Sequence, residues 1–584
     1  MRRFTAPFFL LLFFVLFAAT SYLAPHIGNG TVRTDSGPAE PLQLPYSLKT
    51  PGKQTLHYRI DLYKSPLASS LLKIIPDDCI EALSVNGVPY DVGRISGRCD
   101  WSHGATVDIS DALRTGDNTL ELTVAKKDGV GGLNVFGLSD PSAPAATAMR
   151  LLTFLSLGIG IFLLAGKRLS FPLALLLTAA ATLQFHYLGY TDYATRTFDL
   201  LISTGHLDYI KMIAHRFTLP NPTGGWEYHQ PPLYYLLAAA VYRLAETLPV
   251  LDPMRALQLL SFSLFTVFMY YGLRTLERIV PDRIVLTVVG ALLVFWPSGV
   301  IHSVRIGNDI LFYALFAAGT YRIVLWQLGE GTLRPALLAA ALALITKANG
   351  IILFGVIGFL LLFELRRRRD LGGFLHQSAV AAAFFAAAFF VNFADNIYFA
   401  LQNNGQDWLV SNVVNILNRS LFVDNHAFNY LYFDLKTYLG EPFIDAWHDR
   451  YGRQFFWNYL LKSALFSEFF FRENAESATV ISALSLIVYG YILWGMAIAR
   501  RNRATLVMAL VFLLSVTALL LYRIKIPVAC NTDFRYIYPV LIPMSYFFAQ
   551  SLLYFRDSRR LKNLYGFGIF TALLFVAASA LFFV

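Results

Sequence analysis

Charged residues and cysteines are both scarce in this sequence. Asp, Glu, Lys and Arg make up only 15% of the 584 residues, whereas 56% are hydrophobic, which is far more apolar than a soluble globular protein of this length. The three cysteines show no CxxC or Cys–His spacing suited to a zinc site. The sequence also lacks a P-loop, a dinucleotide-binding glycine motif and a nucleophile elbow, which weighs against nucleotide-driven transport and hydrolase chemistry.

Long apolar runs fill most of the chain instead. A helix needs about 20 apolar residues to cross a hydrocarbon core of about 30 Å, and runs of this kind recur from about residue 149 onward. Together with the N-terminal run they make fourteen candidate helices, near residues 147–165, 170–187, 232–248, 256–274, 284–301, 310–327, 335–346, 350–365, 375–392, 479–498, 504–521, 537–553 and 563–583. We therefore predict a polytopic α-helical membrane protein.

Basic residues occur in short groups between these helices. The groups lie at residues 167–168, 366–369, 500–503 and 556–562 and are typical of positive-inside anchors. Placing all of them on the inner side requires an odd number of crossings, so we expect about 13, with one of the segments 232–248, 256–274 and 335–346 not crossing. The basic residues behind the net charge of +10 are therefore expected to contact membrane lipids. No nucleic acid partner is expected.

The first 140 residues have a different pattern. Residues 1–24 combine a basic start with a long apolar run, which favours an N-terminal transmembrane anchor over a cleaved signal peptide. A Pro-rich linker is expected over residues 25–52. From residue 53 to 140, apolar and polar residues alternate as in half-buried strands, so we predict a small exported β-sandwich. Cys79 and Cys99 lie in it, either as a disulfide, which would fit an oxidising compartment, or as two buried thiols.

This sandwich resembles the jelly-roll sugar-binding modules attached to many glycoside hydrolases. The resemblance rests on residues 79–87, 108–113 and 116–120. Many such modules are only spacers, so the resemblance leaves carbohydrate binding open.

Two regions of the membrane part are polar and lack the charge pattern of cytoplasmic loops: residues 189–231 and 393–478. The second mixes aromatic with polar residues, as in amphipathic helices lying over a cavity. The first gathers carboxylates, imidazoles and aromatic rings. A sugar substrate needs such groups, because carboxylates bind hydroxyls, rings bind its C–H face and a base activates the attacking alcohol. We therefore expect the active site in the first loop.

Several motifs occur in a recognisable order along residues 147–584. An acidic residue in the first exported loop precedes Pro231-Pro232-Leu-Tyr-Tyr, and later motifs are His302-Ser-Val-Arg305-Ile-Gly-Asn308-Asp309, Leu344-Ile-Thr-Lys347 and Asp533-Phe-Arg535-Tyr536. Together they resemble the C-type membrane glycosyltransferases, in particular protein O-mannosyltransferases and lipid A aminoarabinose transferases.

This resemblance implies a membrane glycosyltransferase. Such an enzyme transfers a monosaccharide from a polyprenyl-phosphate carrier to an envelope glycan, lipid or protein, with inversion at the anomeric carbon. It lies in the bacterial inner membrane, with its active site facing the periplasm or the exterior.

The acceptor hydroxyl must lose a proton to a carboxylate base. Asp199 is the first choice for this catalytic role and Asp192 is the second, and the remaining alternatives are Asp208 or none of these three residues. Relatives have a tight Asp-Glu pair at this position, and the looser spacing here leaves the choice between the candidates open.

The leaving phosphate should meet positive charge. Arg305, Lys347 and Arg535 are the candidates, and Lys347 is unusual because it lies between two apolar runs. An ionisable group at such a depth suggests a function, although a snorkelling lysine at a helix end is the alternative. Asn308 and Asp309 would hold these cations in place or cap the following helix.

The end of the first loop has the remaining candidates. His206, Glu227 and Tyr228 are expected to bind substrate, and Glu227 with His229 would hold a divalent metal ion together with His206. Metal dependence stays open, because relatives with a metal have a basic residue directly before Pro-Pro, where this chain has Gln230. Tyr234 and Tyr235 are interpreted as an interfacial aromatic belt.

Two other classes of function compete with this prediction. One is a transporter or flippase of polyprenyl-linked sugars, and the other is a non-catalytic protein of envelope glycan assembly. Transporters tend to have charges within helices and paired repeats, whereas polar groups here gather in the exported loops and no internal repeat is evident. Transfer is therefore preferred.

Overall fold

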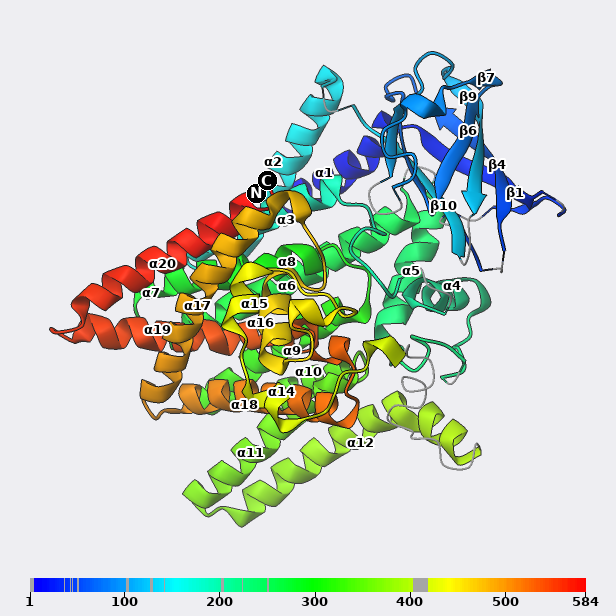
Figure 1. The fold of residues 1–584 in the computed structure, drawn as a ribbon. Helices are drawn as coiled ribbons and strands as arrows, with labels where there is room; N and C mark the ends of the chain where they lie inside the picture. Colours follow the sequence, from blue (N-terminus) through cyan, green and yellow to red (C-terminus); the bar gives the residue numbers. More distant parts are fainter. Residues whose placement is uncertain are drawn as a thin grey trace. The chain divides into compact units, whose positions relative to one another are not determined.

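The computed structural model describes residues 5–35, 37–42, 44, 46–49, 52–100, 104–126, 130–140, 142–200, 204–222, 224–248, 251–402 and 419–584. These residues form two compact units. One contains Met1–Gly160 with Glu246–Asp252, and the other contains Ile161–Ala245 with Pro253–Val584. Figure 1 shows the strands of the first unit in blue and most helices of the second in green to red.

The first unit confirms the predicted β-sandwich. A six-stranded antiparallel sheet has the order β2-β1-β4-β9-β6-β7, and a four-stranded sheet has the order β3-β10-β5-β8. Alternate residues of β4, such as Leu56, Tyr58 and Ile60, are buried in the core, as the period-two pattern predicts. The strands are β1 His26–Thr34, β2 Glu40–Pro41, β3 Tyr46–Lys49, β4 Gln54–Lys64, β5 Leu71–Pro76, β6 Cys79–Val85, β7 Val88–Pro89, β8 Ala105–Asp108, β9 Gly116–Lys126 and β10 Val130–Leu138. Helix α1, Thr5–Thr20, precedes them and α2, Pro144–Ala165, follows.

The prediction of a linker over residues 25–52 is wrong. Strands β1, β2 and β3 lie in this range and belong to the two sheets. Strand β1 pairs with β4 from His26 opposite Tyr63 to Thr34 opposite Leu56. Its two glycines weaken the β pattern in the sequence, and the strand is stabilised by pairing with an exposed edge of β4, which no local signal reveals.

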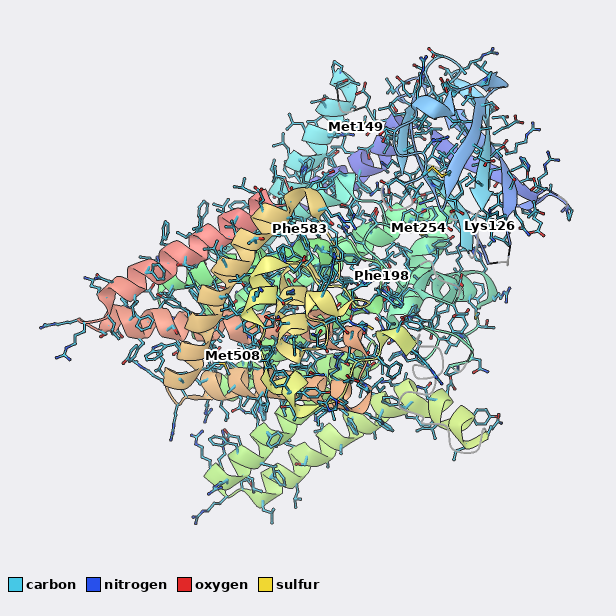
Figure 2. All side chains as sticks on the ribbon, in the orientation of Figure 1. Lys126, Met149, Phe198, Met254, Met508 and Phe583 are labelled. Atoms are coloured by element: carbon cyan, nitrogen blue, oxygen red, sulfur yellow. A yellow bond between two sulfur atoms is a disulfide. The ribbon has the colours of Figure 1, made fainter. Side chains whose placement is uncertain are left out.

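Cys79 and Cys99 form a disulfide, drawn as a yellow bond in Figure 2. The bond joins the start of β6 to the segment before β8. Of the two interpretations of these cysteines, the disulfide is therefore confirmed. Cys530, in the second unit, is a free thiol.

The second unit is helical. Its helices are α3 Phe171–Tyr190, α4 His206–Arg216, α5 Leu233–Glu246, α6 Pro253–Ile279, α7 Arg283–Val294, α8 Pro297–His302, α9 Asn308–Leu328, α10 Arg334–Leu344, α11 Ile351–Arg368, α12 Leu371–Gln402, α14 Ala427–Leu431, α15 Leu435–Gly440, α16 Phe456–Phe466, α17 Ala475–Ile498, α18 Arg503–Lys525, α19 Leu541–Asp557 and α20 Lys562–Leu581. Short 3₁₀ turns lie between them, among them η3 Ala348–Gly350, η7 Ala529–Thr532 and η8 Phe534–Val540. Within the described residues of both units, eleven helices are long and apolar enough to cross a membrane, so this is a multi-pass membrane protein.

All the basic groups of the second unit lie at one end of its helices. Arg274 donates to the carbonyl of Arg168, Arg503 lies 3.8 Å from Glu364, to which Arg368 also pairs, and Arg556 pairs with Asp282. The inner groups predicted from the sequence are thus brought together.

Three expected spanning segments are shorter than a full span: α5, α7 with α8, and α10. Asp282, just before α7, lies at the basic end, whereas Arg305, just after α8, reaches Asp199 at the opposite end. Helix α10 likewise ends before Lys347, which pairs with Asp309 at that opposite end. The α7–α8 pair and α10 therefore run from end to end despite their length.

Helix α5 does not connect the two ends. Its first residue, Leu233, donates its N–H to the carbonyl of Ile345 at 3.3 Å. Arg255, near the start of α6, donates to the carbonyl of Thr191 at 3.0 Å. Both helices thus begin at the same end, so among the predicted segments 232–248, 256–274 and 335–346 the first, which contains α5, is the one that returns without crossing.

The exported region predicted over residues 393–478 is expected to hold amphipathic helices, and its residues 403–418 lie outside the described part of the chain. Helix α12 continues to Gln402, because Asn392, whose polarity interrupts the apolar pattern, donates to the carbonyl of Leu344 at 3.1 Å inside the bundle. Helices α14, α15 and α16 follow within the same region.

Candidate active site

The first polar loop folds so that three of its polar side chains meet. The N–H of His206, at the start of α4, donates to the carbonyl of Asp199 at 2.9 Å, and the N–H of Glu227 donates to the carbonyl of Thr204 at 3.0 Å. The Thr204 backbone has a positive φ of 65°, and the carboxylate of Asp208 accepts its N–H at 2.7 Å. Asp208 therefore stabilises the loop.

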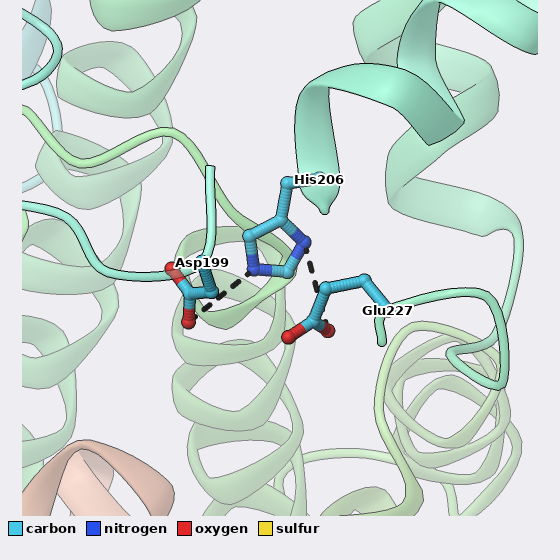
Figure 3. A group of neighbouring side chains, drawn as sticks. All are labelled: Asp199, His206 and Glu227. Carbon is cyan, nitrogen blue, oxygen red and sulfur yellow. Dashed lines mark ion pairs between the residues drawn. The ribbon is translucent and has the colours of Figure 1, made fainter. Parts of the chain in front are cut away.

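The imidazole of His206 lies between two carboxyl groups, as Figure 3 shows. Its Nε2 is 3.8 Å from Oδ2 of Asp199, and its Nδ1 is 3.8 Å from Oε2 of Glu227. One oxygen or nitrogen atom of each side chain lies within 4.8 Å of the other two. All three residues are buried, so the cluster is a buried polar group rather than a surface feature.

Tyr235 completes this cluster. Its hydroxyl lies 2.7 Å from Nδ1 of His206, and its ring stacks on Tyr209 at 3.8 Å between centroids. Tyr234 and Tyr235 are both fully buried, so the interpretation as an interfacial belt is wrong. The aromatic pattern of α5 gave no sign that these rings face the protein rather than lipid.

Asp199 is held by two arginines from distant segments. Nη1 of Arg535 donates to its Oδ2 at 2.9 Å, and Nη2 of Arg305 lies 3.6 Å from its Oδ1. Burial alone would raise the pKa of the Asp199 carboxyl, but the guanidinium groups of Arg535 and Arg305 hold this pKa well below its usual range. Asp199 is thus ionised at neutral pH.

The other two members of the cluster are neutral. Burial lowers the pKa of His206 to about 4. Burial, followed by the negative charge of Asp199, raises the pKa of Glu227 to about 8. Oε2 of Glu227 is buried without a hydrogen-bond partner. Neighbouring carboxyl groups with pKa values pushed apart are characteristic of acid–base sites.

A second cation lies next to Arg535. The ammonium group of Lys347 donates to the carboxylate of Asp309 and lies 4.8 Å from the centroid of the Tyr536 ring. The guanidinium carbon of Arg535 lies 5.1 Å from the same ring centroid. Lys347 is buried and paired, so the alternative of a snorkelling lysine is wrong.

Asn308 connects the first polar loop with the segment that precedes Lys347. Its Nδ2 donates to Oε1 of Gln230 at 2.9 Å and to the carbonyl of Thr346 at 3.3 Å. It therefore fixes the start of α9 to the end of the first loop and to the residue before Lys347.

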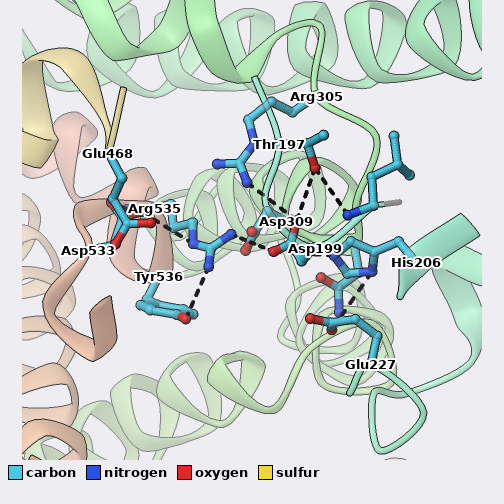
Figure 4. A network of polar contacts seen from close by, with 12 residues as sticks. Thr197, Asp199, His206, Glu227, Arg305, Asp309, Glu468, Asp533, Arg535 and Tyr536 are labelled. Carbon is cyan, nitrogen blue, oxygen red and sulfur yellow. Dashed lines mark hydrogen bonds and ion pairs between the residues drawn. The ribbon is translucent and has the colours of Figure 1, made fainter. Parts of the chain in front are cut away.

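Two carboxyl groups that were not predicted from the sequence, those of Asp533 and Glu468, lie near Arg535, as Figure 4 shows. Oδ2 of Asp533 lies 3.3 Å from Nε of Arg535, and Glu468 accepts a hydrogen bond from the hydroxyl of Tyr459. Burial, then the charge of Asp533, raises the pKa of Glu468 to about 7. Asp533 belongs to the Asp-Phe-Arg-Tyr motif and could have been chosen from it, whereas Glu468 had no local signal.

Three predicted residues lie apart from the cluster. Asp192 accepts the backbone N–H groups of Ala194 at 2.6 Å and Thr195 at 3.0 Å. Tyr228 is half-buried with its ring edge-on to Tyr209, and Nε2 of His229 lies 3.3 Å from Nε2 of Gln230. In place of the expected Glu227–His229 pair, the structure brings Glu227 together with Asp199 and His206.

Comparison with known proteins gives a distant similarity of fold. No protein-family model and no curated protein matches the sequence. One similar solved structure is ArnT from Cupriavidus metallidurans bound to undecaprenyl phosphate, with 12% identity, a TM-score of 0.41 and coverage of 68% of this chain and 62% of that chain. Another is the archaeal oligosaccharyltransferase AglB from Archaeoglobus fulgidus in complex with an inhibitory peptide and a dolichol-phosphate, with 14% identity, a TM-score of 0.41 and coverage of 70% and 55%.

Both neighbours are C-type membrane glycosyltransferases, the family that the sequence motifs resemble. The chain spans about three fifths of the length of these neighbours. Because so low a TM-score reflects only a distant similarity, the function has to be inferred from the side chains of the site.

Proposed function

We propose that this protein is a membrane glycosyltransferase that uses a polyprenyl-phosphate sugar as donor. The observation that supports this most is the ionised Asp199 beside Arg305 and Arg535, with Lys347 close by. A carboxylate base next to several fixed cations is what transfer from a phosphate leaving group requires. The acceptor is an envelope glycan, lipid or protein.

The reaction is a displacement at the anomeric carbon. The acceptor hydroxyl oxygen forms a bond to this carbon, the bond from the carbon to the phosphate oxygen breaks, and the carrier leaves as polyprenyl phosphate. Asp199 takes the proton of the hydroxyl, and Arg535 with Lys347 compensates the charge of the phosphate. Attack from the face opposite the phosphate inverts the anomeric configuration.

The low pKa of Asp199 also has a consequence for the order of events. A carboxylate held by two guanidinium groups is a weak base, because the optimum pKa of a base lies near the working pH. A donor phosphate that draws Arg535 toward itself would weaken that hold and raise the pKa of Asp199. The base is then strongest when the donor is bound.

The site lies at the end of the bundle opposite the basic groups. By the positive-inside rule this end faces outward. The disulfide between Cys79 and Cys99 fits an oxidising compartment. We infer that transfer takes place on the periplasmic or outer side of a bacterial inner membrane.

A divalent metal ion suits the cluster of Asp199, His206 and Glu227, whose possible ligand atoms lie within 4.8 Å of one another. The carboxylate of Asp199 and the neutral imidazole of His206 are suitable ligands, and Glu227 would become one by losing its proton to a bound cation. The buried, unpartnered Oε2 of Glu227 is the atom that a cation would satisfy. A bound ion would add positive charge for the leaving phosphate. The three residues would orient it, while Tyr235 holds the His206 ring.

A Glu227→Gln variant tests this ligand set. We expect the metal content of the purified protein, measured by inductively coupled plasma mass spectrometry after incubation with Mn²⁺ or Zn²⁺, to fall by about 10-fold or more. His229→Gln is the matched control and should keep the metal. Loss of metal in His229→Gln but not in Glu227→Gln would show that His229, and not Glu227, is a metal ligand.

Incubation of the purified protein with a panel of radiolabelled polyprenyl-phosphate sugars tests the proposed function itself. We expect one donor to release free polyprenyl phosphate in the presence of an envelope extract. Transport of intact donors across proteoliposomes without cleavage of any of them would instead show a flippase.

A further inference from the structure

Arg196 lies on the first polar loop, three residues before Asp199, with its guanidinium group on two phenylalanine rings. Its Cζ is 4.1 Å from the centroid of Phe471 and 5.7 Å from that of Phe469. Its Nε donates to the hydroxyl of Tyr187 at 3.1 Å. Arg196 is half-buried, and within the described parts of the chain no carboxylate pairs with it.

Phe469 connects this arginine to the catalytic site. The guanidinium carbon of Arg305 lies 5.4 Å from the centroid of the same ring, and Arg305 itself reaches Asp199. The guanidinium groups of Arg196 and Arg305 are therefore no more than about 11 Å apart. The distance from a ligand group bound by Arg196 to the base would then be about the length of a short oligosaccharide.

An exposed aromatic ring adjoins the same surface. Phe198, labelled in Figure 2, stacks on Phe469 at 5.1 Å between centroids with an angle of 15° between the rings. Its side chain is nevertheless 56% exposed. An exposed, fixed ring is suited to the C–H face of a sugar.

We propose that Arg196, Phe198 and Phe469 form a subsite for the acceptor, and that the acceptor has a negatively charged group, a carboxylate or a phosphate, close to the hydroxyl that receives the sugar. This inference rests on the proposed function and names the chemical class of its acceptor.

Charge balance favours the acceptor over the donor as the ligand of Arg196. Arg305 and Arg535 share the carboxylate of Asp199, and Lys347 with Arg535 stands at the phosphate end of the site. Arg196 also lies by the Phe469 ring, and among the residues that the structure describes it has no carboxylate as a counter-charge. Guanidinium groups bind carboxylates and phosphates in a planar, bidentate manner, and their weak hydration lets them stay on aromatic rings while doing so.

Binding of three small probes to the full-length protein in detergent micelles tests the subsite. The probes are a disaccharide with one glucuronic acid, the same disaccharide with glucose in that position, and the glucose disaccharide phosphorylated at the same position. We expect the charged probes to bind about 10- to 100-fold more tightly than the neutral one, the range for charge-assisted hydrogen bonds, and Arg196→Gln to abolish this preference. The better of the two charged probes identifies carboxylate or phosphate as the natural group.

Two control variants separate the guanidinium from its surroundings. Tyr187→Phe removes the hydrogen bond to Nε but keeps the cation, and should keep the preference for charge. Arg216→Gln removes an exposed arginine of α4 and should leave the preference unchanged. Loss of the preference in Arg216→Gln as in Arg196→Gln would show general attraction of anions and would overturn the subsite.

Other outcomes also decide the matter. Equal binding of charged and neutral probes by the wild-type protein would overturn the proposal. The same conclusion follows if Arg196→Gln weakens binding of undecaprenyl phosphate as much as that of the charged probe, because Arg196 would then belong to the donor. Probe binding is measured without turnover, so an enzyme that cleaves no donor would refute the proposed function and leave this test valid.

Discussion

An Asp199→Asn enzyme is expected to lose sugar transfer by about 10²- to 10⁴-fold, the usual contribution of a general base. The amide has the same shape as the carboxylate and still accepts the hydrogen bond from Arg535, but it takes no proton. Because the groups proposed to contact phosphate stay in place, binding of undecaprenyl phosphate should change far less than transfer. Parallel measurement of single-turnover transfer and of carrier binding checks the two expectations.

Asp192→Asn is the matched control for this experiment. Asp192 is acidic and lies on the same loop, but its carboxylate accepts the N–H groups of Ala194 and Thr195. Weakening these hydrogen bonds should cost about 1 kcal/mol of loop stability and reduce transfer less than 10-fold. A loss of transfer as large as that in Asp199→Asn would make Asp192 the base. Full activity in both variants would remove the base assignment from this loop.

The choice between these two acids shows what the sequence could and could not predict. Both follow a membrane helix, and both lie among aromatic and polar residues, so their local patterns are equivalent. They differ in burial and in contact with Arg535, which lies 336 positions away in the chain. Only the packing of helices far apart in sequence brings such a partner close, and local periodicity contains no information on it.

The same limit accounts for the errors at Tyr235 and at strand β1. An apolar helix with tyrosines near its end suits both a lipid-facing and a bundle-facing position, and the structure buries Tyr235 against His206. Strand β1 contains two glycines and becomes a strand through its partner β4. By contrast, the β-sandwich and the spanning helices of full length follow directly from periods of two residues and runs of about 20, which require no knowledge of partners.

An Arg535→Gln enzyme is expected to lose transfer by about 10²-fold or more, and to change its dependence on pH. Arg535 is the strongest cationic partner of Asp199. Without it, only weaker contacts such as that of Arg305 oppose the rise in the pKa of Asp199 that burial causes. The pKa of Asp199 then rises. Since the base must be deprotonated, kcat/KM of the wild type falls only as the pH drops below the usual range of Asp, and in the variant this fall begins at higher pH.

The complete pH profile of kcat/KM separates the two roles of Arg535. A lower plateau of kcat/KM would show that stabilisation of the phosphate is lost. A shift of the acid limb of the profile would show that Arg535 no longer lowers the pKa of Asp199. Arg305→Gln should shift the limb in the same direction by a smaller amount, because its nitrogen lies 3.6 Å from Asp199 rather than 2.9 Å.

Removing Arg535 also leaves Asp533 buried without its cation and Asp199 with Arg305 alone, and breaking a buried ion pair costs about 3–5 kcal/mol in comparable cases. Arg535→Lys therefore accompanies the Gln variant. It keeps the charge but not the fork that spans Asp199, Asp533 and Tyr536, so the acid limb should stay near that of the wild type while the plateau falls. An acid limb that stays in place in both the Gln and the Lys variants would show that Arg535 acts on the phosphate alone, and that the basicity of Asp199 is set elsewhere.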